Sequence, residues 1–181
     1  MLRGTATFTE QEARGKRWFD DETKGNCASC HPDTIASGLP AFTDYGFIAL
    51  ALPRNGAIPA NADPAYFDLG LCGPYRTDLA KHAEYCGTFR TPTLRNVATR
   101  RRFGHNGVFK TLTQVVEFYA TRDVTPERWY GKGRKFDDLP PRYHANVNMD
   151  PPFGGKRMLA ASEIADIVAF LGTLNDGYAP R

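Results

Sequence analysis

The chain has 181 residues, of which 41% are hydrophobic and 24% charged, and its formal net charge at pH 7 is +3. We expect residues 1–181 to form one domain, because this length suffices for a single core. The small net charge is not that of a nucleic-acid-binding protein, and no segment has the roughly 20 apolar residues of a membrane span. The 13 prolines and 17 glycines predict a mainly α-helical protein with long irregular loops.

The first predicted element is a helix over residues 9–20. Thr9 and Glu12 have the spacing of a capping box, in which each side chain accepts a hydrogen bond from the other residue's backbone N–H. The helix should end shortly before the next motif. We expect it to bury three residues: Gly15, Trp18 and Phe19.

The sequence Cys27-Ala28-Ser29-Cys30-His31 follows this helix. C-x-x-C-H is the attachment signature of c-type haem, in which two thiols form thioethers with the porphyrin vinyl groups and the histidine ligates iron. One helical turn from Cys27 would bring both sulfurs to one porphyrin edge. We therefore predict one covalent haem c held by Cys27 and Cys30, with His31 as the proximal ligand.

Two other cysteines, Cys72 and Cys86, leave alternatives open. A zinc site could use all four cysteines, although Cys72 and Cys86 are not a C-x-x-C pair, and a dithiol redox pair lacks a surrounding βαβ pattern. Haem c is attached outside the cytoplasm in bacteria, so we expect a periplasmic location, with a signal or upstream segment absent from this chain. Cys72 and Cys86 would then form a disulfide, worth about 3 kcal/mol for a loop of 15 residues, or else remain free thiols.

Residues 38–93 are rich in Pro, Gly and Asn and predict an extended loop that wraps the haem. So long a loop indicates function. Residues 122–157 are also expected to be loop, because five prolines interrupt them.

A second helix is predicted after Thr111, which can serve as its N-cap. Leu112, Val115, Val116 and Tyr119 recur at i, i+3, i+4 and i+7, so they share one face. Tyr119 therefore points inward with the aliphatic side chains. By this pattern alone it is a core tyrosine.

The last predicted helix spans about residues 162–174 and stops at Asp176-Gly177. First and last helices that flank a haem motif imply the cytochrome c arrangement, in which they cross, and Gly15 would permit their close approach. The apolar stripe of the last helix consists of Ile164, Ile167, Val168, Leu171 and Leu174.

Several blocks, taken in order, resemble the bacterial dihaem cytochrome c peroxidase and MauG family. They are residues 15–19, 27–31, 89–97 (Phe-Arg-Thr-Pro-Thr-Leu-Arg-Asn-Val), 105–107, 115–119 and 163–171, and the resemblance runs from about residue 9 to 177. It is to the C-terminal half of a two-domain, two-haem protein. The resemblance implies a six-coordinate, electron-transferring haem here and a peroxide-reacting haem in an N-terminal half that is absent from this chain.

The resemblance also implies the sixth ligand of the haem iron. The peroxidases have a methionine at the position of Tyr119, whereas MauG-like proteins have a tyrosine there and use it as the axial ligand. A phenolate favours ferric iron and lowers the reduction potential. Met149 and Met158 are the alternatives, and His105 and His144 are further candidates that are more typical of hydrogen-bonding loop histidines.

Two further expectations concern arginines near the middle of the chain. We assign Arg95 to the haem propionates, with a surface salt bridge as the alternative. Many relatives have T-x-P-Y-F-H where this chain has Arg100-Arg101-Arg102-Phe103-Gly104-His105, and main-chain oxygens of that motif help to hold calcium. Three guanidinium groups oppose a dication, which puts calcium in doubt. The arginine run is otherwise a solvated or propionate-facing patch.

The leading hypothesis is a haem c electron-transfer domain of a MauG-like or peroxidase-type oxidoreductase, with a second haem domain or subunit and a redox partner protein as its partners. A free-standing monohaem carrier without catalysis is the first alternative. The second is a domain with weak peroxidase activity of its own. The substrate is not encoded in any motif of the chain.

Overall fold

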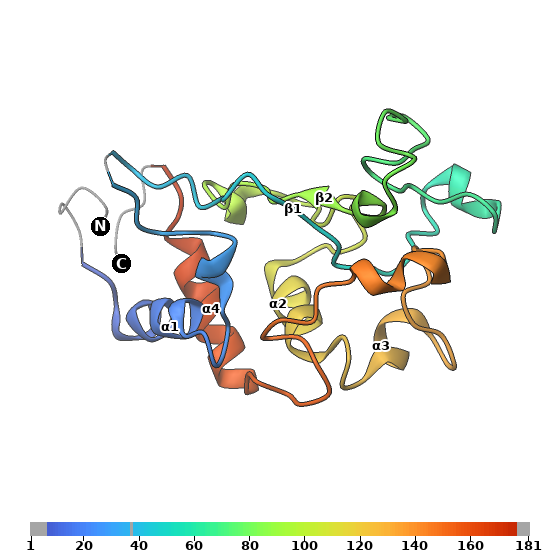
Figure 1. Ribbon diagram of the computed structural model, residues 1–181. Helices are drawn as coiled ribbons and strands as arrows, with labels where there is room; N and C mark the ends of the chain where they lie inside the picture. The colour runs from blue at the N-terminus through green and yellow to red at the C-terminus, as the bar shows by residue number, and fades with distance from the viewer. Residues whose placement is uncertain (1–6, 37, 177–181) are drawn as a thin grey trace.

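The computed structural model describes residues 7–36 and 38–176, which form a mainly helical fold with long irregular segments, as predicted (Figure 1). The α-helices are α1 (Glu10–Asp20), α2 (Leu112–Thr121), α3 (Pro126–Tyr130) and α4 (Ala161–Gly172). Short 3-10 turns are η1 (Cys27–Ser29), η2 (Pro59–Ala62), η3 (Ala83–Tyr85), η4 (Val97–Thr99) and η5 (Pro141–Asn146). Within the described residues, none of the helices has the length and apolar character needed to cross a membrane.

Helix α1 begins with the predicted capping box. The Thr9 hydroxyl accepts from the backbone N–H of Glu12 at 3.3 Å, and the Glu12 carboxylate accepts from the N–H of Thr9 at 2.8 Å. Phe19 is buried as expected. The expectation that Trp18 is buried is wrong: Trp18 is half-buried at the rim of the helix pair, where Lys24 Nζ covers its ring at 5.5 Å.

Helices α1 and α4 cross directly against each other, as Figure 1 shows at the end of the molecule that carries both described termini. The crossing depends on Gly15, because a Cβ atom there would lie 1.9 Å from the carbonyl oxygen of Asp166. Arg14 adds a charged link, with Nε and Nη2 donating to the Asp166 carboxylate at 3.0 and 3.2 Å. The predicted packing of the terminal helices is therefore confirmed.

Helix α4 ends two residues earlier than predicted, at Gly172, and the predicted stop at Asp176-Gly177 falls partly outside the described residues because Gly177 is not among them. Of its predicted stripe, Ile164, Ile167 and Leu171 are buried, whereas Val168 and Leu174 are half-buried. The sequence pattern missed Phe170, which is 1% exposed and packs edge-on against Phe19 with ring centroids 5.2 Å apart.

Helix α2 has two buried faces. Its Thr111 cap is confirmed, since the hydroxyl accepts from the N–H of Gln114 at 3.1 Å. The face that carries Tyr119 points into the molecule, as predicted. The second face carries Phe118, which is fully buried and packs edge-on against Trp129 of α3 at 5.5 Å.

The long segment between residues 38 and 93 is irregular, as predicted, except for the short turns η2 and η3 and one small sheet. Strands β1 (Phe47–Ile48) and β2 (Phe89–Arg90) pair antiparallel. The predicted disulfide between Cys72 and Cys86 is present, with Cα atoms 5.1 Å apart. It fastens a loop that extends beyond the sheet (Figure 1).

The prediction that residues 122–157 are loop throughout is wrong. Pro126 and Pro141 stand in the first turns of α3 and η5 instead of interrupting them. Proline suits the first turn of a helix, because its missing N–H would have no partner there and its φ is already helical. Proline can therefore mark the start of a helix in this segment as well as an interruption of regular structure.

Candidate functional site

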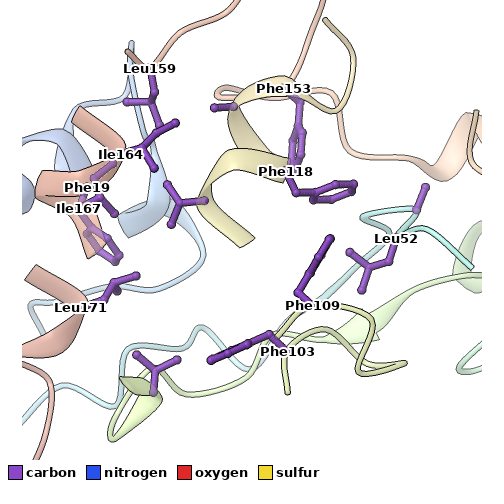
Figure 2. Close-up of a cluster of buried hydrophobic side chains, with 14 of the residues drawn as sticks. Phe19, Leu52, Phe103, Phe109, Phe118, Phe153, Leu159, Ile164, Ile167 and Leu171 are labelled. Atoms are coloured by element: carbon purple, nitrogen blue, oxygen red, sulfur yellow. The ribbon is translucent and has the colours of Figure 1, made fainter. Parts of the chain in front are cut away.

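A cavity of about 320 Å³ lies at the centre of the described fold. Figure 2 shows the buried side chains in two groups that face each other across it: Phe19, Leu159, Ile164, Ile167 and Leu171 on the α1 and α4 side, and Leu52, Phe103, Phe109, Phe118 and Phe153 on the α2 side. Most of these side chains line the cavity. Its walls are thus predominantly apolar.

The C-x-x-C-H motif forms one edge of the cavity. Asn26, with φ 47°, takes the left-handed conformation that turns the chain from α1 into η1. The backbone N–H of His31 then donates to the carbonyl of Cys27 at 2.8 Å, which closes a single helical turn. Cys27, Cys30 and His31 all line the cavity.

The His31 ring has a fixed orientation. Its Nδ1 atom lies 2.9 Å from the carbonyl oxygen of Phe42, and because a carbonyl only accepts, Nδ1 is the protonated nitrogen. Burial lowers the pKa of His31 below its ordinary value of 6.5. The neutral ring therefore carries a lone pair on Nε2, the state that a metal-ligating histidine requires.

The sulfur chemistry rules out a zinc site that uses all four cysteines and disfavours dithiol redox chemistry. Cys72 and Cys86 are joined to each other and so provide no thiolates for a metal. Cys27 faces the cavity, and desolvation by the enclosing side chains raises its pKa to about 12. A redox-active cysteine ordinarily has a lowered pKa, because the thiolate is the reactive form.

Tyr119 reaches the same cavity from α2, together with Leu112, Val115 and Val116 of its face. Its ring stacks on that of Phe153, with centroids 5.0 Å apart and planes 28° apart. Burial raises the pKa of the Tyr119 phenol above its ordinary value of 10, so the phenol is neutral at pH 7 in the protein alone.

The other candidate ligands lie in different places. Met149 and Met158 are not among the residues that line the cavity, and Met149 is 52% exposed with its sulfur 3.2 Å from Arg122 Nη2. His144 also lies away from the cavity, with Nε2 2.9 Å from the carbonyl of Leu139. His105 does line the cavity, where its ring stacks on Phe89.

Arginines surround part of the cavity, but Arg95 is not one of them. Arg95 Nη2 instead donates to Asp176 at 3.1 Å, which is the surface salt bridge that the sequence left as the alternative. The arginines that line the cavity are Arg90, Arg100 and Arg102. The sequence pattern could have indicated Arg90, because it follows Phe89 in the same motif as Arg95.

Two further residues of the site were given no role by the sequence patterns. Phe153 follows two prolines in a segment expected to be loop, and only its apolar character marked it. Thr91 lines the cavity, and its buried hydroxyl has no hydrogen-bond partner in the described part of the chain. An unpartnered buried hydroxyl is costly unless a bound group completes its hydrogen bonding.

The residues around the cavity fit a covalently held haem c. Two thiols and an oriented neutral imidazole stand at one edge, and the walls are apolar enough for a porphyrin ring. Arg90, Arg100 and Arg102, with the Thr91 hydroxyl, would supply donors for the propionates of such a group. The fit rests on the chain's own side chains.

Comparison with known proteins gives a consistent match over almost the whole chain. No family model matches it. The methylamine utilization protein MauG of Paracoccus denitrificans is 30% identical over 185 residues, and the cytochrome-c peroxidase IdrP1 of Pseudomonas sp. (strain SCT) is 30% identical over 180 residues. These matches cover 97% and 91% of this chain, but 45% and 40% of the relatives.

Solved structures agree. The dihaem peroxidase BthA of Burkholderia thailandensis is 44% identical with a TM-score of 0.85, and a Tyr-to-Met variant of BthA is 42% identical with a TM-score of 0.89. They match 95% and 97% of this chain and 44% of their own length in both cases, which supports the cytochrome c-like fold class. The chain thus spans less than half the length of the relatives it matches. Within that span it is a homologue of the dihaem cytochrome c peroxidase and MauG family.

Proposed function

We propose that this chain is the haem c electron-transfer domain of a MauG-like or peroxidase-type oxidoreductase, equivalent to the C-terminal half of its two-haem relatives. The observation that carries the proposal is the apolar cavity that has Cys27, Cys30 and His31 at one edge and Tyr119 on α2. When bound there, the haem would supply reversible one-electron chemistry at its iron.

Each side chain has a proposed role toward that group. Cys27 and Cys30 would hold it through thioethers, and His31 Nε2 would ligate iron while the Phe42 carbonyl holds the ring. Tyr119 would be the sixth ligand, with its proton lost on binding because a metal cation favours the anionic oxygen. The apolar walls would exclude water from both axial sides.

The first test is covalent attachment. Chain matured in a periplasm that contains the haem-attachment system should keep its haem after denaturation, with the mass of one haem added and none added in a Cys27→Ser, Cys30→Ser variant. A denatured mass equal to that of the bare polypeptide would refute the proposal.

The second test concerns the sixth ligand. Tyr119→Phe should convert a low-spin ferric signal in electron paramagnetic resonance to high-spin and raise the reduction potential, because it removes an anionic donor that favours ferric iron. Met149→Leu, Met158→Leu and His105→Asn are matched controls and should keep the parent's signal. Loss of the low-spin signal in one of these variants, with Tyr119→Phe unchanged, would assign the ligand to that residue.

The proposed partners follow from the relatives. BthA is described as a dihaem peroxidase, so we propose a second haem domain or subunit as the site that meets peroxide, and a separate redox protein as the electron source. The disulfide and the thioether chemistry support a periplasmic location. Calcium is not part of the proposal.

A free-standing monohaem carrier is not favoured, because the relatives that match almost all of this chain include dihaem enzymes. The isolated chain should cycle between ferric and ferrous states but turn over peroxide slowly, since His31 and Tyr119 would both bind the iron. Rapid peroxide turnover by the isolated chain would favour the domain with its own peroxidase activity.

A further inference from the structure

Arg122 is the largest fully buried side chain in the described fold, with 0% exposure. It is the C-cap residue of α2, three positions after Tyr119, so the two side chains leave the helix on neighbouring parts of one face. An arginine is rarely buried so completely without a specific arrangement around it. The sequence patterns gave it no role.

The charge of Arg122 is balanced within the core. Asp123 is also buried, and its Oδ2 atom accepts from Arg122 Nε at 3.1 Å and from Nη2 at 2.8 Å. Lys135 Nζ lies 2.7 Å from the other carboxylate oxygen. Burial raises the pKa of Asp123, but these cations outweigh it and hold the pKa below its ordinary value. The carboxylate is therefore ionised, and Arg122 is firmly held.

The guanidinium also joins separate segments of the cavity wall. Nη1 donates to the carbonyl of Leu50 at 3.1 Å and Nη2 to that of Asn148 at 2.7 Å, and both of these residues line the cavity. These contacts fix the plane of the guanidinium. The plane in turn lies over the ring of Phe153, with Cζ 3.7 Å from the ring centroid.

Phe153 is therefore shared between Arg122 and Tyr119. The Tyr119 ring stacks on it at 5.0 Å, and the Phe118 ring meets it edge-on at 6.5 Å. Phe153 is only 6% exposed and lines the cavity, so its ring has little freedom to turn. A fixed Phe153 ring restricts rotation of the Tyr119 ring, because the two are stacked.

We propose that Arg122 and Phe153 are positioning residues that hold the Tyr119 phenol oxygen toward the iron of the bound haem. The inference rests on the proposed function, in which Tyr119 is the sixth ligand. Arg122 fixes the Phe153 ring through the cation–π contact, and Phe153 fixes the phenol through ring stacking. Neither residue needs to touch the iron.

The haem-loaded chain tests this inference through its ferric spin state and reduction potential. Phe153→Leu keeps an apolar side chain and the charge of Arg122, but removes the stacking. It should convert part of the low-spin ferric signal to high-spin and raise the potential, in the same direction as Tyr119→Phe. Unchanged spin state and potential in Phe153→Leu would overturn the inference.

Arg122→Met separates positioning from a simple charge effect. Loss of a buried positive charge alone would lower the potential and keep the low-spin signal, since ferric iron carries more positive charge than ferrous iron. Positioning predicts the opposite, a raised potential with a high-spin fraction. A lowered potential with the low-spin signal intact would overturn the inference, and if Arg122→Met does not fold, Phe153→Leu decides.

Arg128→Met is the control, because Arg128 also lies over an aromatic ring, but that ring is Trp129, at 4.9 Å, which does not line the cavity as Phe153 does. Its spin state and potential should equal the parent's. Tyr119→Phe keeps the two proposals distinct: if it leaves the spectrum unchanged, the ligand assignment fails, whereas if it alone changes the spectrum, only the positioning role fails.

Discussion

Gly15 and His31 show how far single residues determine this fold and its site. Gly15 lets α1 and α4 touch, because its missing Cβ would overlap the Asp166 carbonyl oxygen at 1.9 Å. His31 is oriented by one hydrogen bond to the Phe42 carbonyl. Both residues were identified from the sequence. His31 is the histidine of the C-x-x-C-H motif, and the cytochrome c arrangement needs a small residue such as Gly15 where the two helices cross.

Gly15→Ala should destabilise the protein strongly. The added methyl group meets backbone atoms that cannot move without separating the helices, and overpacking of this kind costs about 1–3 kcal/mol or more in the free energy of unfolding. Urea unfolding of the haem-loaded protein measures it. Gly172→Ala is the control on the partner helix, where a Cβ would meet no atom within 4 Å, and it should be neutral or slightly stabilising. Equal stability of the two variants would contradict the assignment.

The positions of residues that belong to no motif could not be predicted from the sequence. Arg122 is a charged residue at a helix end, where solvent exposure is the ordinary expectation. Its burial depends on Asp123 beside it and on the Leu50 and Asn148 carbonyls from distant segments. Arg95 is the opposite case. Its position in a motif suggested that it lies at the cavity, but in the fold it forms a salt bridge with Asp176.

At the scale of elements, the sequence identified three of the four α-helices of the described residues. Helices α2 and α4 bury apolar faces whose 3.6-residue period is visible in the sequence, whereas α1 was identified by its capping box. Helix α3 has only five residues and begins at a proline, which leaves no room for a periodic signal. Strands β1 and β2 have only two residues each, and they pair because the fold brings two distant segments of the chain together.

The stability that the contact between α1 and α4 contributes should depend on pH. The hydrogen-bonded Arg14 guanidinium holds the pKa of Asp166 below its usual 3.8. A lowered pKa means that the ion pair stabilises the folded state above the unfolded pKa and that this contribution is lost as the pH falls through the folded value. Asp166→Asn should therefore be less stable than the parent at pH 7, and the difference should shrink from about pH 5 to about pH 2.

Urea unfolding at several pH values measures this difference. Asp78→Asn is the control, because the Arg76–Asp78 pair is exposed on both sides and water screens it. That variant should match the parent throughout the range. A stability difference for Asp166→Asn that does not change with pH would show that the carboxylate acts by shape and not by charge.

At the scale of the whole molecule, the buried apolar side chains of the described residues form one cluster, and the cavity lies between two groups of its members. One group of buried side chains belongs to α1 and α4 and the other to α2 and the segments around it, as Figure 2 shows. The sequence predicted both helical faces, but the position of the cavity between the two groups became visible only in three dimensions, because it depends on which faces the loops bring together.

We expect a bound haem to couple the two groups more strongly, because residues of both groups line the cavity. In Cys27→Ser, Cys30→Ser protein prepared without haem, the α1 and α4 group and the α2 group lose the ring that both would contact. We expect them to unfold separately. The chain contains two tryptophans, Trp18 on α1 and Trp129 on α3, so each group has its own fluorescent reporter.

Single-tryptophan variants, Trp18→Phe and Trp129→Phe, make the comparison in the haem-free background. Their urea transitions should have different midpoints without haem, whereas absorbance and circular dichroism transitions of the haem-loaded protein should coincide. Cys72→Ser, Cys86→Ser is the control, because it removes two cysteines that do not line the cavity. That variant should keep its haem and one transition, with a loss of about 3 kcal/mol from the open disulfide loop. Coincident midpoints without haem would mean that the protein contacts across the cavity suffice to couple the two groups.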